Sequence, residues 1–149
     1  MGSPSIQVDG RIPPACRLAR PAFLAAARAF AAVSAARIGG APWREVVIHL
    51  VGNDECARVN ALIVHHTGPT DVITQRYDSI PGEPQGLYGE LFINTDRALA
   101  AAPHRAGWSP AKELILYLAH GMDHLSGADD ATPADYNRMR RRELKWMKG

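Results

Sequence analysis

Runs of apolar and β-branched residues, bounded by glycine, proline or asparagine, predict the strands of this chain. The run 44–51 lies between Pro42 and Gly52 and predicts a largely buried strand. Shorter runs predict strands at 6–8, 71–74 and 88–94. The last two are candidates for neighbours in one sheet, because a loop rich in glycine and proline separates them.

Apolar residues at helical spacing predict the helices. An alanine-rich segment follows Pro21, covers 22–38 and stops at Gly39-Gly40, as expected at the two ends of a helix. Another helix is predicted from Ser109 to Ser126, and its apolar run 114–119 indicates that it is buried. The remaining helices are expected at 53–63, at 95–102 and after Thr132, where Thr132-Pro133-Ala134-Asp135 fits a capping box.

Mixed strands that come early and helices that come late are typical of an α+β fold. We expect one compact domain over residues 1–149, with a small mixed central sheet covered by helices and the helix 110–126 buried in the C-terminal half. The chain has 149 residues, of which 46% are hydrophobic and 21% are charged. This composition excludes disordered, collagen-like and coiled-coil proteins, and the length allows a sizeable core.

The sequence predicts neither a membrane protein nor a secreted one. Its longest apolar runs are far shorter than the ~20 residues that a membrane-spanning helix needs, and its first residues lack the pattern of a secretory signal. Cys16 and Cys56 lie singly in different segments, without the spacing of a zinc knuckle or the density of a disulfide scaffold. We therefore expect two reduced thiols and a cytoplasmic location.

The residues that can carry chemistry gather at the end of the helix 110–126. His120 and His124 are four residues apart, so their side chains lie on one helical face and can share a cation. Gly127 can stop the helix in a left-handed conformation. The chain then returns and brings Asp129 or Asp130 toward the two histidines.

A histidine pair at this spacing is a weak motif by itself, and such a pair can also serve only to cap helix carbonyls. The helix stop and the following carboxylate favour a metal site, and two imidazoles with one carboxylate suit one Zn²⁺ per chain with a fourth position open to water. Zinc at such a site would lower the pKa of water toward ~7. Asp123 is a candidate partner of a ligand, a candidate base or a solvent-facing residue.

The segment 120–130, which reads HGMDHLSGADD, resembles the signature H-G-x-x-H-L-x-G-x-D-H of the YbeY family of bacterial endoribonucleases. The resemblance extends over residues 45–147. Further stretches follow in the order of the family: Asn60, PTDVIT at 69–74, GELFI at 89–93, Met139 and Glu143.

The resemblance implies a small α+β metalloprotein that binds one zinc ion and cuts single-stranded RNA. It further implies a role in 16S rRNA 3′-end maturation and ribosome quality control, with rRNA and ribosomal particles as partners. By position, His120, His124 and Asp130 would be the zinc ligands that activate water and thus the catalytic residues.

The chain departs from the family pattern at two positions. Asp130 stands where the family has a third histidine, which adds a negative charge and should make coordinated water less acidic. Val64 stands where the family places an arginine, four residues after Asn60. His65, His66 and Arg76 are candidates to replace its phosphate contact, although none of them matches its position.

Two further groups of residues have both a functional and a structural interpretation. Thr70 and Asp71 can hydrogen-bond a metal ligand or RNA, or can simply form a turn. The last helix is rich in arginine and lysine, and these residues either form a solvated face or contact rRNA phosphates. The net charge of the whole chain, +2, does not decide between them.

Three functions follow as hypotheses. The first is a zinc-dependent endoribonuclease, which predicts metal-dependent RNA cleavage. The second is a ribosome-assembly factor that binds RNA and uses its metal only structurally, which predicts RNA binding that survives metal removal. The third, a hydrolase of small molecules or peptides, is disfavoured because Gly121 occupies the position of the base in the His-Glu-x-x-His motif of zinc proteases.

Overall fold

The computed structural model describes residues 4–39, 43–104 and 106–149. The strands are β1 (Ser5–Asp9), β2 (Trp43–Val51), β3 (Val72–Tyr77) and β4 (Leu87–Asn94). The α-helices are α1 (Arg20–Arg37), α2 (Asn53–Val59), α3 (Thr95–Ala101), α4 (Pro110–Leu125) and α5 (Pro133–Lys148). Single helical turns at Pro14–Cys16, Asn60–Val64 and Ala102–His104 complete the described elements. Gly40 and Pro42, expected at element ends, lie outside the described residues.

The four strands form one mixed sheet in the order β1-β2-β4-β3. β1, β2 and β4 run parallel, and β3 pairs antiparallel with β4, with Val72 opposite Ile93 and Tyr77 opposite Tyr88. The predicted pairing of these two strands is therefore confirmed. β3 is longer than its apolar run because Gln75, Arg76 and Tyr77 also pair with β4. This pairing is a tertiary contact, which the residue types at these positions do not predict.

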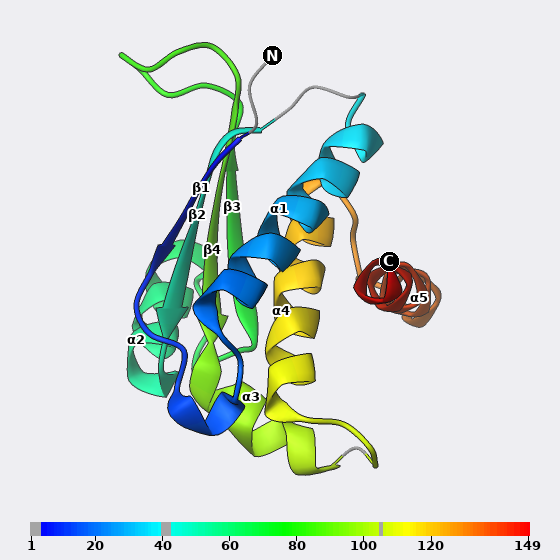
Figure 1. The fold of residues 1–149 in the computed structure, drawn as a ribbon. Helices are drawn as coiled ribbons and strands as arrows, with labels where there is room; N and C mark the ends of the chain where they lie inside the picture. Colours follow the sequence, from blue (N-terminus) through cyan, green and yellow to red (C-terminus); the bar gives the residue numbers. More distant parts are fainter. Residues whose placement is uncertain (1–3, 40–42, 105) are drawn as a thin grey trace.

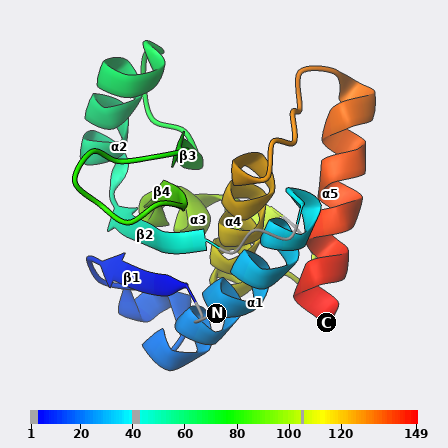
Figure 2. The ribbon, with the colours of Figure 1, turned by 90° about the horizontal axis from the view of Figure 1, so that it is seen from above.

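Helices cover the two faces of the sheet unequally. α1 and α4 lie side by side on one face, α2 lies on the other, and α5 packs outside α4 (Figures 1 and 2). α5 is seen nearly end-on in Figure 1 while α4 runs along the page, so the two helices cross steeply. The main core lies between the sheet and α1 with α4, and it contains the fully buried Phe23, Ile48, Leu91 and Leu118. The predicted α+β class is confirmed.

Two helices begin as the sequence predicts. Ser109 Oγ accepts a hydrogen bond from the backbone N–H of Lys112, and Thr132 Oγ1 accepts one from Asp135. The helix predicted at 53–63 differs, because α2 ends at Val59 and a π-helical turn follows it. Asn53 is the first residue of α2 and does not cap it, because its side-chain oxygen accepts a hydrogen bond from Asn94.

None of the described helices is both long enough and apolar enough to cross a membrane. The two cysteines are free and buried. Burial raises the pKa of each thiol above its ordinary value.

Gly121 marks the closest approach of α4 to the sheet. A Cβ atom placed on it would lie 2.3 Å from Leu91 Cδ2 and 3.1 Å from Val72 Cγ2, closer than carbon atoms can pack. The absence of a side chain at this position is therefore a packing requirement. It also explains in physical terms why no catalytic glutamate can occupy the residue after His120.

We expect Gly121→Ala to destabilise the protein by about 1–3 kcal/mol, the usual cost of forcing an extra methyl group into a packed core. The midpoint of urea denaturation should fall accordingly. Gly149→Ala is a matched control, because its added Cβ would lie 3.8 Å from its nearest neighbour. Equal midpoints for the two variants would contradict the close contact between α4 and the sheet.

Candidate metal centre

The two histidines come from the buried second half of α4. His120 is 6% exposed, and His124 lies one turn further toward the end of the helix. Gly127 follows with a left-handed φ of +96°, which turns the chain back as its sequence position predicts. This turn places Asp130 beside both imidazoles, while Asp129 is exposed.

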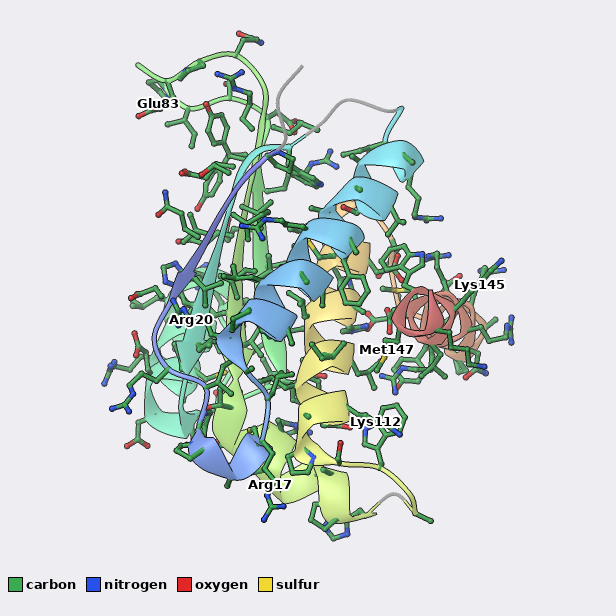
Figure 3. All side chains as sticks on the ribbon, in the orientation of Figure 1. Arg17, Arg20, Glu83, Lys112, Lys145 and Met147 are labelled. Carbon is green, nitrogen blue, oxygen red and sulfur yellow. The ribbon has the colours of Figure 1, made fainter. Side chains whose placement is uncertain are left out.

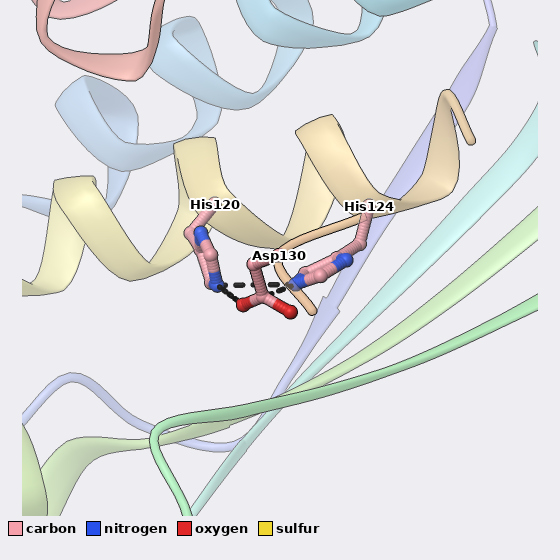
Figure 4. A group of neighbouring side chains, drawn as sticks. All are labelled: His120, His124 and Asp130. Atoms are coloured by element: carbon pink, nitrogen blue, oxygen red, sulfur yellow. Dashed lines mark hydrogen bonds and ion pairs between the residues drawn. The ribbon is translucent and has the colours of Figure 1, made fainter. Parts of the chain in front are cut away.

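Three ligand-type atoms converge at this point (Figure 4). His120 Nε2 and His124 Nε2 lie 3.1 Å apart, and Asp130 Oδ2 is 3.5 Å from the first and 3.4 Å from the second. All three donors lie within 4.8 Å of one another, a spacing that can hold one metal ion. Within the described residues, this is the only cluster of three histidine, cysteine or carboxylate side chains with that geometry.

The other nitrogen of each imidazole is already engaged. His120 Nδ1 lies 2.8 Å from Glu143 Oε2, a residue of α5, and His124 Nδ1 lies 3.1 Å from the carbonyl oxygen of Ala128. These two acceptors place the protons on Nδ1 and leave the Nε2 lone pairs directed at Asp130. Histidines that bind metals usually have this kind of partner on the second nitrogen, so the residues present fit a bound metal ion.

The electrostatics of the site combine burial with negative charge. Burial lowers the pKa of His120, but the hydrogen bond and charge of Glu143 oppose burial, and the net effect is a raised pKa. The pKa of Glu143 is itself raised by burial, although the bond to His120 acts in the opposite direction. The surrounding carboxylates therefore favour a positive charge at His120.

Asp123 lies behind the histidines in a second buried ionic cluster. Its carboxylate is fully buried and receives two hydrogen bonds from Arg142 of α5, at 2.9 and 3.1 Å. Arg37 of α1 lies 3.8 Å from the same carboxylate. Asp123 is therefore not a solvent-facing residue, and its full burial against two guanidinium groups keeps it from acting as a base toward a substrate.

The backbone of Asp123 also supports the turn that carries Asp130. Its carbonyl oxygen accepts hydrogen bonds from the hydroxyl and backbone N–H of Ser126 and from the N–H of Ala128. Ala128 in turn presents its own carbonyl to His124. The helix end, the turn and one imidazole thus form a single hydrogen-bonded unit.

A cleft of about 310 Å³ opens beside His124. It lies between β3 and the π-helical turn, and it is lined by Asn60, Val64, His66, Thr70, Val72, Ile73, Thr74 and His124. Val64, which stands at the family's arginine position, is one of its walls. Of the three residues considered as replacements for that arginine, His66 lines the cleft.

Arg76 is engaged elsewhere, because it donates to the carbonyl oxygen of Leu125 and pairs with Asp78. The carboxylate of Asp71 accepts a hydrogen bond from the backbone N–H of Val72 at 2.7 Å, so it forms a local turn. Thr70 borders the cleft, while its carbonyl oxygen accepts a hydrogen bond from Asn94. A local turn is therefore present at Asp71, whose charge also raises the pKa of His120, and Thr70 retains a place beside the site.

The sequence matches Glu143 to the family pattern without giving it a role, and it predicts for Arg142 only a place on a solvated or phosphate-binding face. Both lie 19 or more residues from their partners on α4, and a helix rich in arginine does not show which arginine points inward. The one signal that could have singled them out is spacing: Met139 and Glu143 are four residues apart and form the buried stripe of an otherwise polar helix.

Comparisons with known proteins agree with this geometry. The family model described as "Endoribonuclease YbeY" matches residues 19–149. Relatives named Endoribonuclease YbeY include one from Rhodopirellula baltica, which is 34% identical over 119 residues covering 79% of this chain and 60% of the relative. One from Chloroflexus aurantiacus is 38% identical over 111 residues, covering 69% of this chain and 71% of the relative. This chain thus spans less than two thirds of the length of the first of these relatives.

A solved structure shows the same fold. The solution structure of TM1509 from Thermotoga maritima superimposes with a TM-score of 0.56, covering 95% of this chain and 85% of that one. The two sequences are 22% identical, so the likeness concerns the architecture.

We expect Glu143→Gln to weaken Zn²⁺ binding about tenfold, because the glutamine retains an acceptor for His120 Nδ1 but loses the negative charge. A competition titration against a chromophoric chelator measures this. Glu113→Gln is the matched control: Glu113 is also a buried glutamate, but it accepts a hydrogen bond from Trp108 Nε1. If both variants bound zinc as the parent does, Glu143 would have no influence on the cluster.

Proposed function

This chain belongs to the YbeY family, and from that premise we propose that it is a metal-dependent endoribonuclease that acts on single-stranded RNA. The observation that carries the proposal is the convergence of His120, His124 and Asp130 next to an open cleft. We propose Zn²⁺, one ion per chain, held by these three residues, because two imidazole nitrogens and one carboxylate oxygen are a donor set that zinc accepts. We also propose that residues 1–149 act as one such hydrolase domain.

A divalent cation at this position supplies Lewis-acid chemistry, which eases the deprotonation of water at neutral pH and polarises a phosphoryl oxygen. The chain's own residues provide the rest. Glu143 and the carbonyl of Ala128 fix the tautomers and orientations of the two imidazoles. Asp130, with its side chain 35% exposed, stands on the solvent side of the cluster, where it can also orient an incoming water molecule.

The cleft beside His124 suits a short stretch of flexible RNA. Its volume of about 310 Å³ is at the small end of ligand pockets, which matches one nucleotide better than a duplex. His66, Thr70 and Thr74 provide polar side chains along its walls, and Val64 and Val72 provide apolar contacts for a base. A base can enter this space only from an unpaired strand, which supports single-stranded RNA as the substrate.

We further propose that the substrate is 16S rRNA, at its 3′ end, and that the protein acts on ribosomal particles in the cytoplasm during maturation and quality control. The family likeness of the segment 120–130 supports this part of the proposal, since the cleft geometry specifies RNA only as a chemical class.

An alternative is a ribosome-assembly factor that binds RNA and in which the metal is structural. Val64 favours it, because this apolar side chain lines the cleft where a guanidinium group would contact phosphate. The two functions differ in what metal removal does: cleavage requires the ion, whereas RNA binding by an assembly factor does not.

We expect Asp130→Ala to weaken Zn²⁺ binding by more than tenfold, because it removes one of three donors. Asp130→His should retain the metal, since imidazole is an equally good donor, and removal of one negative charge should make coordinated water more acidic. Asp129→Ala is the control, because Asp129 is exposed and outside the cluster. Zinc dissociation constants for the three variants decide the matter, and parental affinity in Asp130→Ala would exclude Asp130 as a ligand.

We expect the purified protein to cleave unstructured RNA, to lose cleavage on treatment with a chelator and to regain it with Zn²⁺. His120→Ala should stay inactive at every zinc concentration, whereas Asp129→Ala should behave as the parent. Denaturing gels of an end-labelled RNA provide the readout. If the protein binds RNA without cleaving it, and the chelator does not change this binding, the result would contradict the endoribonuclease function and support the assembly factor.

A further inference from the structure

The positive charge of this protein is concentrated on one helix. α5 contains six arginine and lysine residues against two acidic residues, a net charge of +4. The rest of the chain contains eleven basic and thirteen acidic residues, a net charge of −2. The overall charge of +2 therefore conceals a basic helix attached to a slightly acidic body.

Four of the six basic residues form a straight line along α5. Arg138, Arg141, Lys145 and Lys148 follow one another at intervals of three, four and three residues, the spacing of one helical face. All four are exposed. This line, called the basic ridge below, lies on the side of α5 opposite the buried Glu143, and Figure 3 shows Lys145 pointing away from α4.

The other two basic residues of α5 are used inside the protein. Arg142 binds Asp123, and Arg140 Nε lies 3.4 Å from Glu143 Oε1. On the ridge, Arg138 pairs with Asp135, but within the described part of the chain no carboxylate pairs with Arg141, Lys145 or Lys148. Like charges at these intervals repel one another. The ridge therefore lowers the stability of the protein, and among the residues that the structure describes only Arg138 has an acidic partner to offset this repulsion.

We propose that the basic ridge binds the phosphate backbone of RNA outside the cleft, as a second contact surface for long substrates. The ridge covers eleven residues, and its ends lie about 15 Å apart along the helix. A stacked strand carries one phosphate per about 3.4 Å, so four charges over this length match about four successive phosphates. Because arginine and lysine read phosphate without reading bases, the contact is independent of sequence.

The ridge and the cluster occupy opposite sides of the same helix. Glu143 holds His120 on the inner side of α5, and the turn that carries Asp130 leads directly into the first residue of that helix. An RNA that leaves the cleft past the start of α5 would reach Arg138 before Lys148. The ridge therefore contributes to long RNA and not to an oligomer that only fills the cleft. This inference rests on the proposed function for the nature of its ligand.

The test compares two double variants with equal loss of charge. Arg141→Gln with Lys145→Gln alters the ridge, and Arg11→Gln with Arg17→Gln removes two exposed arginines outside α5. Binding of a fluorescein-labelled 40-nucleotide RNA and of a dinucleotide, both with phosphorothioate linkages that keep the negative charge and slow cleavage, is measured by anisotropy from 50 to 200 mM KCl on the zinc-loaded proteins. Denaturing gels after each titration verify that the RNA is intact.

We expect the ridge variant to bind the 40-nucleotide RNA about tenfold more weakly than the control variant at the lowest salt. The slope of log affinity against log salt should fall by about 0.7 for each phosphate contact that is lost. For the dinucleotide, which can only fill the cleft, the two variants should agree within twofold.

Equal affinities and equal salt slopes for the two variants on the long RNA would overturn the proposed RNA contact of the ridge. Equal losses of affinity on the long and the short RNA would also overturn it. Cleavage by the parent is measured separately. If the parent cleaves RNA while the two variants bind it equally, only the proposed RNA contact of the ridge is overturned. If the parent never cleaves RNA but the ridge variant binds the long RNA more weakly, the endoribonuclease proposal is overturned and the RNA contact of the ridge stands.

Discussion

The hydrogen bond between His120 and Glu143 is the interaction on which the candidate site depends. A fully buried carboxylate is costly unless it is bonded, and Glu143 has His120 Nδ1 at 2.8 Å and Arg140 at 3.4 Å to offset that cost. The same bond leaves His120 Nε2 free to face His124 and Asp130. The hydrogen bond that joins α5 to α4 therefore also orients the imidazole of His120 for metal binding.

The ionic cluster of Asp123 extends this dependence to α1. Arg142 reaches Asp123 from α5, and Arg37 reaches it from the end of α1, so three helices meet at one buried carboxylate. Such a cluster contributes little net stability, because desolvation consumes most of the attraction between its charges. Its effect is to fix how the helices lie against one another. The turn with Ala128 and Asp130 is positioned by the same residue, because it is hydrogen-bonded to the carbonyl of Asp123.

The sequence predicts those parts of this molecule that local chemistry determines. The capped starts of α4 and α5, the left-handed stop at Gly127 and the two histidines on one face all follow from short-range rules. The choice between Asp129 and Asp130, the role of Glu143 and the burial of Asp123 do not follow from such rules, because each depends on which helix packs against which.

α5 joins the two halves of the proposed function because its two faces have opposite tasks. Its inner face contributes Glu143 and Arg142 to the clusters behind the metal ligands, and its outer face contributes the basic ridge. A helix so rich in charge is held by its few inward residues: Met139 is buried, Trp146 and Met147 pack against the main core, and Glu143 and Arg142 bind buried side chains of α4. The partners that orient His120 and support Asp123 thus also anchor the surface that we assign to RNA.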